Sequence, residues 1–345
     1  MKTKPLLQAI EMLYPAVADK PLVPEMGDLR IKDQSIVATD GLVWTRVALE
    51  ESSGVDCRAP AEKLLRLLRS LTAEDVELKQ DAGNLIVEAG RVVGTFSVST
   101  EPSMLDELDF EVEAWVPIPA DFLEGIKLCR FAASRDASQG AVSGVLLTKG
   151  RAVASDGFKI AVRFCKGSPP ADGPVVLSGE LADYIASVAA EVESWAVRGE
   201  TALFRLKGGA VIGGKTLTGQ FPDLSEPIKA AKALDGKLEL PEDVSASLRR
   251  HIGQLDGVPE HDRQVTVAAE GGELIVSSTD GATYKLRETL VLEKPMETPV
   301  SFQVNPTLLT EIVGRTRTMG YDEKSPFVAF GESSGLLYLV AVTRS

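Results

Sequence analysis

Apolar and polar positions alternate along much of the chain, and three of the alternating stretches share the same turn. In each, an apolar strand pattern runs into an Asp-Gly pair and then resumes. In the middle copy Ile160, Val162 and Phe164 alternate on one face after the turn Ser155-Asp156-Gly157. An Asp-Gly pair between alternating segments is typical of a β-hairpin with a tight turn. Three such hairpins are predicted, at residues 36–47, 153–164 and 275–286.

The spacing of these hairpins indicates an internal repeat. Their aspartates stand at positions 40, 156 and 280, so that they are 116 and 124 residues apart. Three copies in 345 residues leave about 115 residues for each copy, which is an ordinary domain size. One Asp-Gly hairpin would indicate little, but three at nearly equal spacing predict a triplicated chain.

Helix start signals mark a second period, about half as long as the first. A proline at the first helical position, or a Ser or Asn cap, recurs at steps of 55 to 64 residues and precedes apolar residues at helical spacing. Alternating strands follow each helix, so the chain is interpreted as six strand–helix–sheet half-units. The first half-unit has almost no room for its strand. The expected helix starts are Pro5, Pro60, Pro119, Ser178, Pro241 and Asn305-Pro306.

Pairing the half-units predicts an α+β protein of three similar domains. Two acidic stretches that contain proline, residues 101–109 and 221–227, are expected to be linkers. The predicted domains are residues 1–112, 113–235 and 236–345.

Composition describes an ordinary globular protein. Hydrophobic residues make up 44% of the chain and charged residues 25%, with a formal net charge of −13. No segment approaches the roughly 18 apolar residues of a membrane span, and none resembles a signal peptide. The unclustered Cys57, Cys129 and Cys165 are expected to be reduced thiols in a cytoplasmic protein. The acidic balance still permits local basic stripes.

One motif suggests nucleotide chemistry, but its context argues against that. Residues 209–216 match the phosphate-loop pattern G-x-x-x-x-G-K-[ST]. This pattern binds phosphate only between a strand and a helix, whereas Gly219 and Pro222 leave no helix here. A Gly-containing hairpin is the favoured interpretation, with an NTPase as an alternative. His251 and His261 lack metal ligands at suitable spacing, and we expect no catalytic residues, metal or cofactor.

The triplicated chain resembles the bacterial sliding clamp, the β subunit of DNA polymerase III. Each matching stretch is weak alone, and their order and spacing carry the resemblance. They are Lys20-Pro21-Leu22-Val23-Pro24 with Gly27, Phe96-Ser97-Val98-Ser99-Thr100, Ser143-Gly144-Val145-Leu146-Leu147, Val153-Ala154-Ser155-Asp156-Gly157, Gly219-Gln220-Phe221-Pro222-Asp223 and the strand from Leu337 to Arg344. The resemblance implies a DNA clamp fold, in which a head-to-tail homodimeric ring has helices lining its hole and sheets outside. Such a ring is a processivity factor that tethers the replicative polymerase to duplex DNA and has no enzymatic activity.

The resemblance further implies basic residues that face DNA without reading its sequence. Such phosphate contacts need only a modest number of Lys and Arg residues. Basic residues late in helices also complement helix dipoles, which is the plain structural interpretation of the same residues. The candidates are Lys20 at the edge of the hole, Lys63, Arg66 and Arg69 on the second helix, Lys127, Arg130 and Arg135 around the third, Arg249 and Arg250 on the fifth, and Arg315 and Arg317 on the sixth.

A pocket for partner proteins is implied between the second and third domains. In the family, polymerases, the clamp loader and repair proteins insert a short segment that contains Gln and Leu. A shallow apolar groove with strand-edge hydrogen bonds is the expected mode of binding, and ordinary strand core is the alternative interpretation of most positions. The matching positions are Val142, Ser155, Gly157, Phe158, Lys159, Ile160, Pro222, Pro306, Val340, Ala341, Val342 and Thr343.

The chain departs from the family pattern at the expected ring interface. Phe96 and Val98 are expected to supply its apolar part. Residues 284–287, Tyr-Lys-Leu-Arg, stand where the family tends to carry acids, so the usual ion pairs are not carried over. The alternative function is a clamp-like protein that binds replication factors without encircling DNA.

Overall fold

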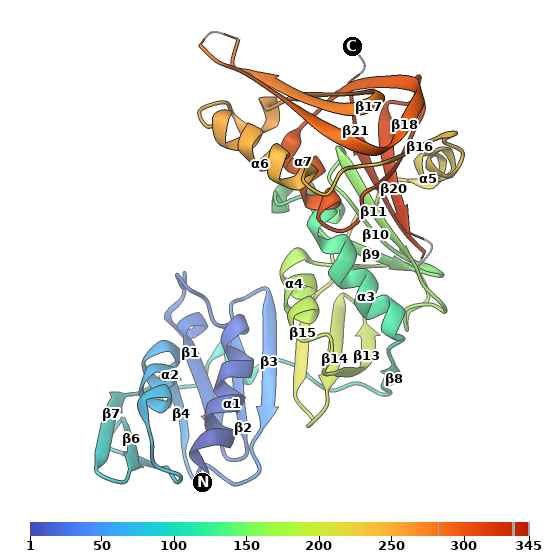
Figure 1. The fold of residues 1–345 in the computed structure, drawn as a ribbon. Coiled ribbons are helices and arrows are strands. Elements are labelled where there is room, and N and C mark those ends of the chain that lie inside the picture. The colour runs from blue at the N-terminus through green and yellow to red at the C-terminus, as the bar shows by residue number, and fades with distance from the viewer. Residues whose placement is uncertain (282, 333–334, 344–345) are drawn as a thin grey trace. The chain divides into compact units, whose positions relative to one another are not determined.

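The computed structural model describes residues 1–281, 283–332 and 335–343. The chain forms two compact units, each assembled from two separate segments (Figure 1). The first unit comprises residues 1–123 and 168–218, and the second comprises residues 124–167 and 219–345. Arg344, with which the resemblance ended the last strand, lies outside the described residues.

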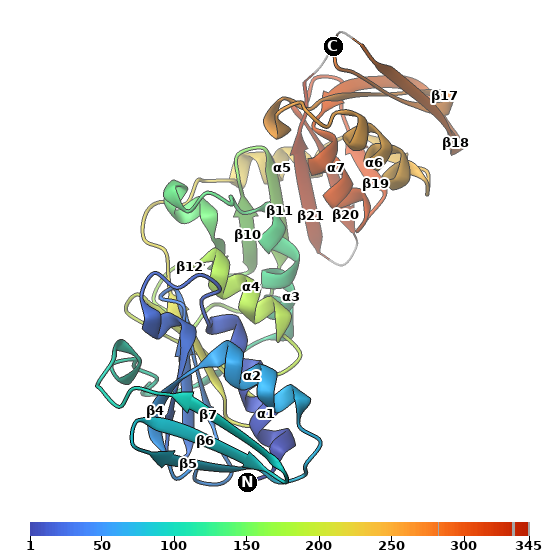
Figure 2. The same ribbon diagram turned by 90° about the vertical axis from the view of Figure 1, so that its left-hand side faces the viewer.

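An antiparallel sheet forms the first unit, with the strand order β4-β1-β2-β3-β15-β14-β13-β8. β3 pairs with β15, so strands from both sides of the predicted boundary at residue 112 share one sheet. Helices α1 and α2 pack together beside β1–β3, and α4 packs against β15 (Figures 1 and 2). The bounds are α1 (Thr3–Leu13), η1 (Tyr14–Ala16), η2 (Pro24–Gly27), β1 (Asp28–Lys32), β2 (Ser35–Thr39), β3 (Val43–Ala48), β4 (Asp56–Pro60), α2 (Ala61–Ser70), η3 (Met104–Asp106), β8 (Val116–Pro117), β12 (Val175–Leu177), α4 (Gly179–Ser187), β13 (Val192–Arg198), β14 (Thr201–Leu206) and β15 (Val211–Lys215).

A second, three-stranded sheet in this unit packs against α2. Its order is β5-β6-β7, so β7 is an edge strand. A Cβ atom at Gly94 of β7 would lie only 2.5 Å from Leu67 Cδ2, so the glycine permits the close approach of α2. The bounds are β5 (Glu77–Asp81), β6 (Asn84–Ala89) and β7 (Val92–Ser97).

The second unit has its own antiparallel sheet, in the order β9-β10-β11-β21-β20-β19-β16, and a two-stranded ribbon of β17 and β18. Helices α6 and α7 lie side by side, and α6 contacts the ribbon (Figures 1 and 2). The bounds are α3 (Ala120–Cys129), which crosses the boundary between the units, η4 (Arg130–Ala132), η5 (Ala137–Ser143), β9 (Val145–Thr148), β10 (Arg151–Ser155), β11 (Lys159–Phe164), α5 (Ser225–Lys232), β16 (Gly236–Glu239), α6 (Val244–Gln254), η6 (Glu260–Asp262), β17 (Val265–Thr279), β18 (Lys285–Val304), α7 (Pro306–Val313), β19 (Thr318–Tyr321), β20 (Phe327–Glu332) and β21 (Leu336–Ala341).

All three predicted hairpins form, and the same aspartate chemistry closes each turn. Asp40 Oδ1 accepts hydrogen bonds from the amides of Leu42 and Val43, both at 2.8 Å. Asp156 Oδ1 accepts hydrogen bonds at 2.9 Å from the amides of Phe158 and Lys159. Asp280 Oδ1 likewise accepts hydrogen bonds at 2.9 Å from the amides of residues 283 and 284. An aspartate that binds amides further along the chain is a side-chain turn. The middle turn lies one residue later than the predicted Ser155-Asp156-Gly157, because β10 continues through Ser155 and β11 begins at Lys159.

Side-chain caps account for the predicted helix starts at Ser178 and Asn305. Ser178 Oγ accepts from the amide of Leu181 at 3.2 Å, and Asn305 Oδ1 accepts from the amide of Thr307 at 2.9 Å. The start predicted at Pro241 lies three residues too early, since α6 begins at Val244. The first strand is reduced to a single bridge, between Lys2 and residue 75, as expected.

The predicted linker at residues 221–227 is wrong, because α5 begins within it at Ser225. Asp223 Oδ1 accepts from the amide of Ser225 at 2.9 Å and so caps this helix. Ile228 and Ala231, three positions apart, are buried against β10, β11, β20 and β21. A helix of eight residues is marginal alone, and tertiary packing stabilises it.

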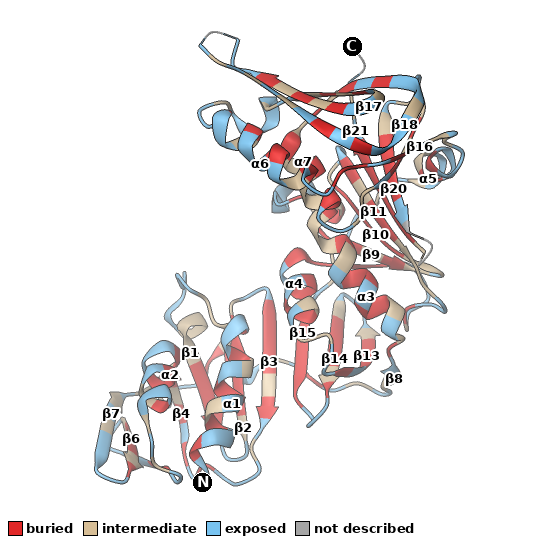
Figure 3. Cartoon of the chain, in the orientation of Figure 1, coloured by how far each residue is buried: buried red, intermediate tan, exposed pale blue. Residues whose placement is uncertain are grey.

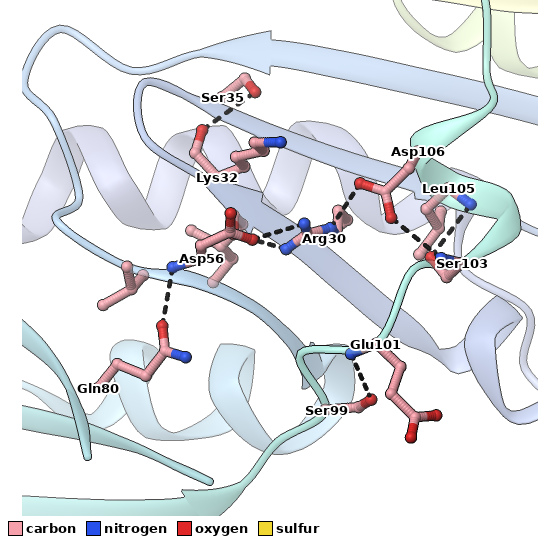
Figure 4. Close-up of polar contacts among 12 residues, drawn as sticks. Arg30, Lys32, Ser35, Asp56, Gln80, Ser99, Glu101, Ser103, Leu105 and Asp106 are labelled. Atoms are coloured by element: carbon pink, nitrogen blue, oxygen red, sulfur yellow. Dashed lines mark hydrogen bonds and ion pairs between the residues drawn. The ribbon is translucent and has the colours of Figure 1, made fainter. Parts of the chain in front are cut away.

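The other predicted linker, residues 101–109, is anchored by a buried arginine (Figure 4). Arg30 on β1 is 7% exposed; its Nε lies 2.8 Å from Asp106 Oδ1, and a guanidinium nitrogen lies 2.5 Å from Asp56 Oδ1. The Ser103 amide also donates to Asp106, at 3.0 Å. Burial alone would raise the pKa of Asp106, but the bonds from Arg30 and Ser103 hold it below its ordinary value.

Residues 209–216 do not form a phosphate loop. Residues 211–215 are the strand β15, paired with β14 on one side and β3 on the other. A Cβ atom at Gly213 would lie 2.2 Å from Trp44 Nε1, and one at Gly214 would lie 3.1 Å from Leu181 Cδ1. These two glycines therefore make room for packed side chains, and no helix N-terminus follows them. This geometry excludes the NTPase alternative.

His251 on α6 is fully buried, not a surface residue as its basic neighbours suggest. Its Nδ1 lies 2.6 Å from Ser278 Oγ, which in turn lies 2.7 Å from Tyr284 Oη. Its Nε2 lies 3.7 Å from Glu288 Oε1, and Arg250 forms a bidentate pair with Glu288. Burial lowers the pKa of His251, and the Arg250 charge lowers it further, against the opposing effect of Glu288.

We expect the second unit to lose stability as pH falls from 7 to 5. The unfolded chain binds a proton at His251 near its ordinary pKa, whereas the folded chain resists protonation, so unfolding takes up a proton. Urea denaturation at several pH values measures this, with a slope of at most about 1.4 kcal/mol per pH unit for one proton. His251→Gln should flatten the dependence, and His261→Gln, at a histidine whose side chain is 79% exposed, should not. Equal slopes in both variants would contradict the assignment.

Candidate partner pocket and nucleic-acid interface

A cavity of about 590 Å³ lies in the second unit. Five parts of the chain line it: residues 133–139, the Asp156 turn, residues 260–264, residues 303–311 at the start of α7, and residues 341–343. The side-chain amide of Asn305, the α7 cap, donates to the Glu260 carbonyl at 2.7 Å. This bond ties the 260–264 loop to the start of the helix, so the cavity wall is continuous.

The structure places five of the predicted pocket residues on this cavity. They are Phe158, Lys159, Ala341, Val342 and Thr343. Phe158 is 65% exposed, which is unusual for a large apolar side chain. The parts at 133–139 and 260–264 were not predicted for this pocket, and within 303–311 only Pro306 was, because their contribution depends on packing between distant segments.

The remaining predicted residues lie elsewhere for reasons of strand geometry. Successive side chains on a strand point to opposite faces, so Ile160 of β11 faces the sheet side opposite to Lys159. On that side Ile160 packs with Phe221 and Leu224 against the buried residues that include Ile228 and Ala231 of α5. Pro222, another predicted pocket residue, follows Phe221 in the chain. Ser155, Pro306 and Val340 are buried, while Val142 and Gly157 adjoin the cavity-lining residues in the chain.

The strand-edge hydrogen bonds expected of this pocket are already used within the chain. The amide of Ala341 donates to the Phe158 carbonyl at 2.8 Å, and that of Val342 to the Pro326 carbonyl at 2.9 Å. The amide of Thr343 donates to the Gln303 carbonyl, also at 2.9 Å. A bound segment therefore meets side chains and carbonyl oxygens here, not a free row of amides.

Charged side chains form one wall of the cavity. Lys159 is 8% exposed, and its Nζ lies 3.1 Å from Asp156 Oδ2 and 3.4 Å from Glu311 Oε2. Arg135, with its side chain 87% exposed, lies 3.8 Å from the other oxygen of Glu311. Two cations thus balance two anions, which keeps the buried lysine paired.

Most of the predicted DNA-facing residues lie on exposed helix surfaces. Lys63, Arg66 and Arg69 are exposed on α2, and Arg249 and Arg250 are exposed on α6. Both helices carry exposed stretches, pale blue in Figure 3. Lys127 is exposed on α3, and Lys20 is exposed in the loop before η2. Arg130 lies in η4, and Arg315 and Arg317 follow the end of α7, so the prediction that these last two lie on the helix is wrong.

Ion pairs divide these basic residues into two groups. Carboxylates pair with Arg66 (Glu62), Arg69 (Glu11), Arg135 (Glu311), Arg250 (Glu288) and Arg317 (Glu239 and Glu242). Lys20, Lys63, Lys127 and Arg249 form no ion pair with another residue of the described chain. Charges in the second group are available to phosphate without first breaking an ion pair.

The predicted interface residues Phe96 and Val98 lie on and just after the edge strand β7. This strand pairs with β6 on one side only, and Val93 on it is 64% exposed. In the second unit, β18 pairs with β17 and exposes Val291 by 79%. An edge strand with exposed apolar side chains is a template for pairing with another chain.

The described residues contain no group of three or more His, Cys, Asp or Glu side chains that could hold a metal ion. Among them there is also no helix long and apolar enough to cross a membrane.

Comparison with known proteins gives one consistent result. No family model matches the chain. The chain is 22% identical over 331 residues to the β sliding clamp of Chlamydia muridarum, covering 90% of this chain and 87% of that protein. Its fold is similar to that of the DNA polymerase III β subunit of Thermotoga maritima, with a TM-score of 0.83 at 19% identity, covering 100% and 98% of the two chains. A sliding clamp of Pseudomonas aeruginosa bound to griselimycin matches with a TM-score of 0.80 at 18% identity, covering 100% and 98%.

Repeated helix-and-sheet units that match solved clamps along the whole chain define the α+β DNA clamp fold. The chain is similar in sequence to a bacterial β sliding clamp along nearly its whole length and has the fold of solved clamps. The family resemblance and the fold class predicted from the sequence are confirmed.

Proposed function

We propose that the protein is a DNA sliding clamp, a cytoplasmic processivity factor without catalytic activity of its own. The observation that carries this is the clamp fold over the full length of the chain. Two copies form a head-to-tail ring around duplex DNA, each contributing three domains, residues 1–112, 113–235 and 236–345. The ring tethers the replicative polymerase, the clamp loader and other replication and repair proteins. Their segments bind at the cavity beside Phe158 and Val342.

A retention assay tests encirclement directly. The clamp is loaded on nicked circular DNA, excess protein is removed, and the DNA is then cut once. A ring held by topology stays on the circle at high salt and is lost after linearisation, whereas a protein held by contacts responds to salt alone. A protein that binds polymerase but shows no difference between circle and line would favour the non-encircling alternative.

The unpaired cations should carry the DNA contacts. We expect Lys63→Ala, Lys127→Ala and Arg249→Ala together to flatten the slope of log affinity against log salt by up to about 2.7, since each lost phosphate contact removes about 0.9. Fluorescence anisotropy with duplex DNA across a salt series measures this. The matched control is Arg66→Ala, Arg69→Ala and Arg250→Ala, which removes three paired charges and should flatten it less. Equal changes would contradict the division into paired and unpaired cations.

A further inference from the structure

Basic side chains of the second unit gather around Phe164, the last residue of β11. Arg151 on β10 is the cross-strand partner of Phe164. Nζ of Lys232, at the end of α5, lies 4.1 Å from the centre of the Phe164 ring. Lys229 precedes Lys232 by three positions, which places both lysines on the same side of α5.

Two more lysines adjoin these residues where β10 and β11 meet. The amide of Gly150 donates to the Gly167 carbonyl at 2.9 Å, and the amide of Cys165 donates to the Gly150 carbonyl at 2.8 Å. These bonds hold the segments that carry Lys149 and Lys166 side by side. The five cations form one surface, which we call the basic patch: Lys149, Arg151, Lys166, Lys229 and Lys232.

The basic patch is accessible and carries more positive than negative charge. Its four lysines are exposed, and Arg151 is half-buried. Arg151 and the two lysines on α5 form no ion pair with another described residue. Asp223 and Glu226 border the patch at the start of α5, and Asp223 is close enough to Arg151 for their charges to attract. Positive charge is therefore concentrated here on a chain whose net charge is −13.

The basic patch lies on the α5 side of the sheet, away from α3. Phe164 packs with Val153 in the apolar cluster that α5 covers. The neighbouring Arg163 faces the other way, because a Cβ atom at Gly125 of α3 would lie 3.4 Å from its Cβ. Successive side chains on a strand point to opposite faces, so Arg151, opposite Phe164, shares the α5 side. A ligand of the patch therefore leaves α3 and its candidate DNA contact free.

The surroundings of the basic patch restrict its anionic ligand. Single-stranded nucleic acid is held without sequence preference by a groove of cations and by aromatic rings that stack on bases. Here Lys232 already covers a face of the central ring, and two carboxylates interrupt the cations. A peptide presents separate carboxylates, which can pair with individual lysines and avoid those two acids. Charge complementarity thus favours an acidic peptide over a nucleic acid.

We propose that the basic patch is a docking surface for an acidic segment of a partner protein. It is separate from the cavity beside Phe158, so it goes beyond the function proposed above. The carboxylates of the segment pair with the exposed lysines of the patch. The acidic balance of the rest of the chain repels such a segment, so the local cations decide where it docks.

Fluorescence anisotropy with the intact protein tests this proposal. The probes are a labelled, capped peptide of alternating Glu and Ser, the same peptide with Gln in place of Glu, and labelled oligothymidylate of equal length. The Glu peptide should bind saturably and the Gln peptide should not. Binding should weaken as salt is raised, because salt screens exposed charge pairs.

Charge reversal locates the binding surface. Lys166→Glu combined with Lys229→Glu should weaken binding of the Glu peptide by about tenfold or more, because like charges then face each other. The matched control is Lys237→Glu combined with Lys294→Glu. It makes the same change in net charge at two exposed lysines of the same unit, on β16 and β18, and should keep the wild-type affinity.

Equal weakening in the two double variants would overturn the inference, because net charge and not the patch would then set the affinity. Absence of saturable binding of the Glu peptide would overturn it as well. A third contrary result is oligothymidylate binding that is tighter than that of the Glu peptide and is lost with Lys166→Glu and Lys229→Glu. That result would make the patch a nucleic-acid site.

Discussion

Arg30→Ala should lower the free energy of unfolding of the first unit by about 1.5–3 kcal/mol, the usual contribution of a hydrogen bond to a charged group, because Arg30 is buried whereas Asp56 and Asp106 stay partly solvated. The substitution leaves Asp56 and Asp106 without their shared cation and releases the segment around Ser103 from β1. Urea denaturation followed by circular dichroism measures the loss.

Lys79→Ala is the matched control for this prediction. Lys79 also contacts two carboxylates, at 2.7 and 3.2 Å, but its side chain is 44% exposed. Exposed ion pairs contribute little to stability because solvent screens them, so this variant should be nearly as stable as the wild type. A loss below about 1 kcal/mol for Arg30→Ala would show that the buried pairs do not anchor the segment.

Phe96→Asp combined with Val98→Asp should convert the proposed dimer into a monomer. Two carboxylates in an apolar strand-edge contact would lose their hydration without gaining partners, which weakens association by about a hundredfold or more. Light scattering over a dilution series should give the mass of one chain, 36.9 kDa, in place of twice that value.

Val93→Lys should shift the dimer in the same direction without touching packed side chains, because Val93 is 64% exposed on β7. Val116→Lys is the control, since Val116 is an exposed valine on a different edge strand, β8. A dimer unaffected by both the Phe96→Asp/Val98→Asp variant and Val93→Lys would place the ring interface elsewhere.

Local interactions explain what could be predicted from the sequence. The Asp-Gly turns are closed by hydrogen bonds within three or four residues, and the caps at Ser178 and Asn305 reach two or three residues ahead. Such contacts are specified by neighbouring residues, so their signals are visible in the chain. Because these signals recur regularly, the repeat could be recognised from the sequence alone, and the repeat in turn led to the resemblance to sliding clamps.

The errors have a common physical cause, which is dependence on distant packing. α5 forms where a linker was predicted because Ile228 and Ala231 are buried against strands of the same unit. His251 follows two arginines yet is fully buried, because Ser278 and Glu288 of the ribbon lie against its ring. No short-range pattern signals either outcome.

The candidate site divides along the same line. The sequence by itself determined that Phe158 would follow a turn and that residues 36–47, 153–164 and 275–286 would be hairpins, since these are properties of adjacent residues. Only the tertiary structure decided that β21 pairs with β11, and that Glu311, more than 150 positions away, pairs with Lys159. It also decided which basic residues are neutralised by carboxylates. Charge pairing and cavity shape depend on distances between segments, and those distances exist only once the chain has folded.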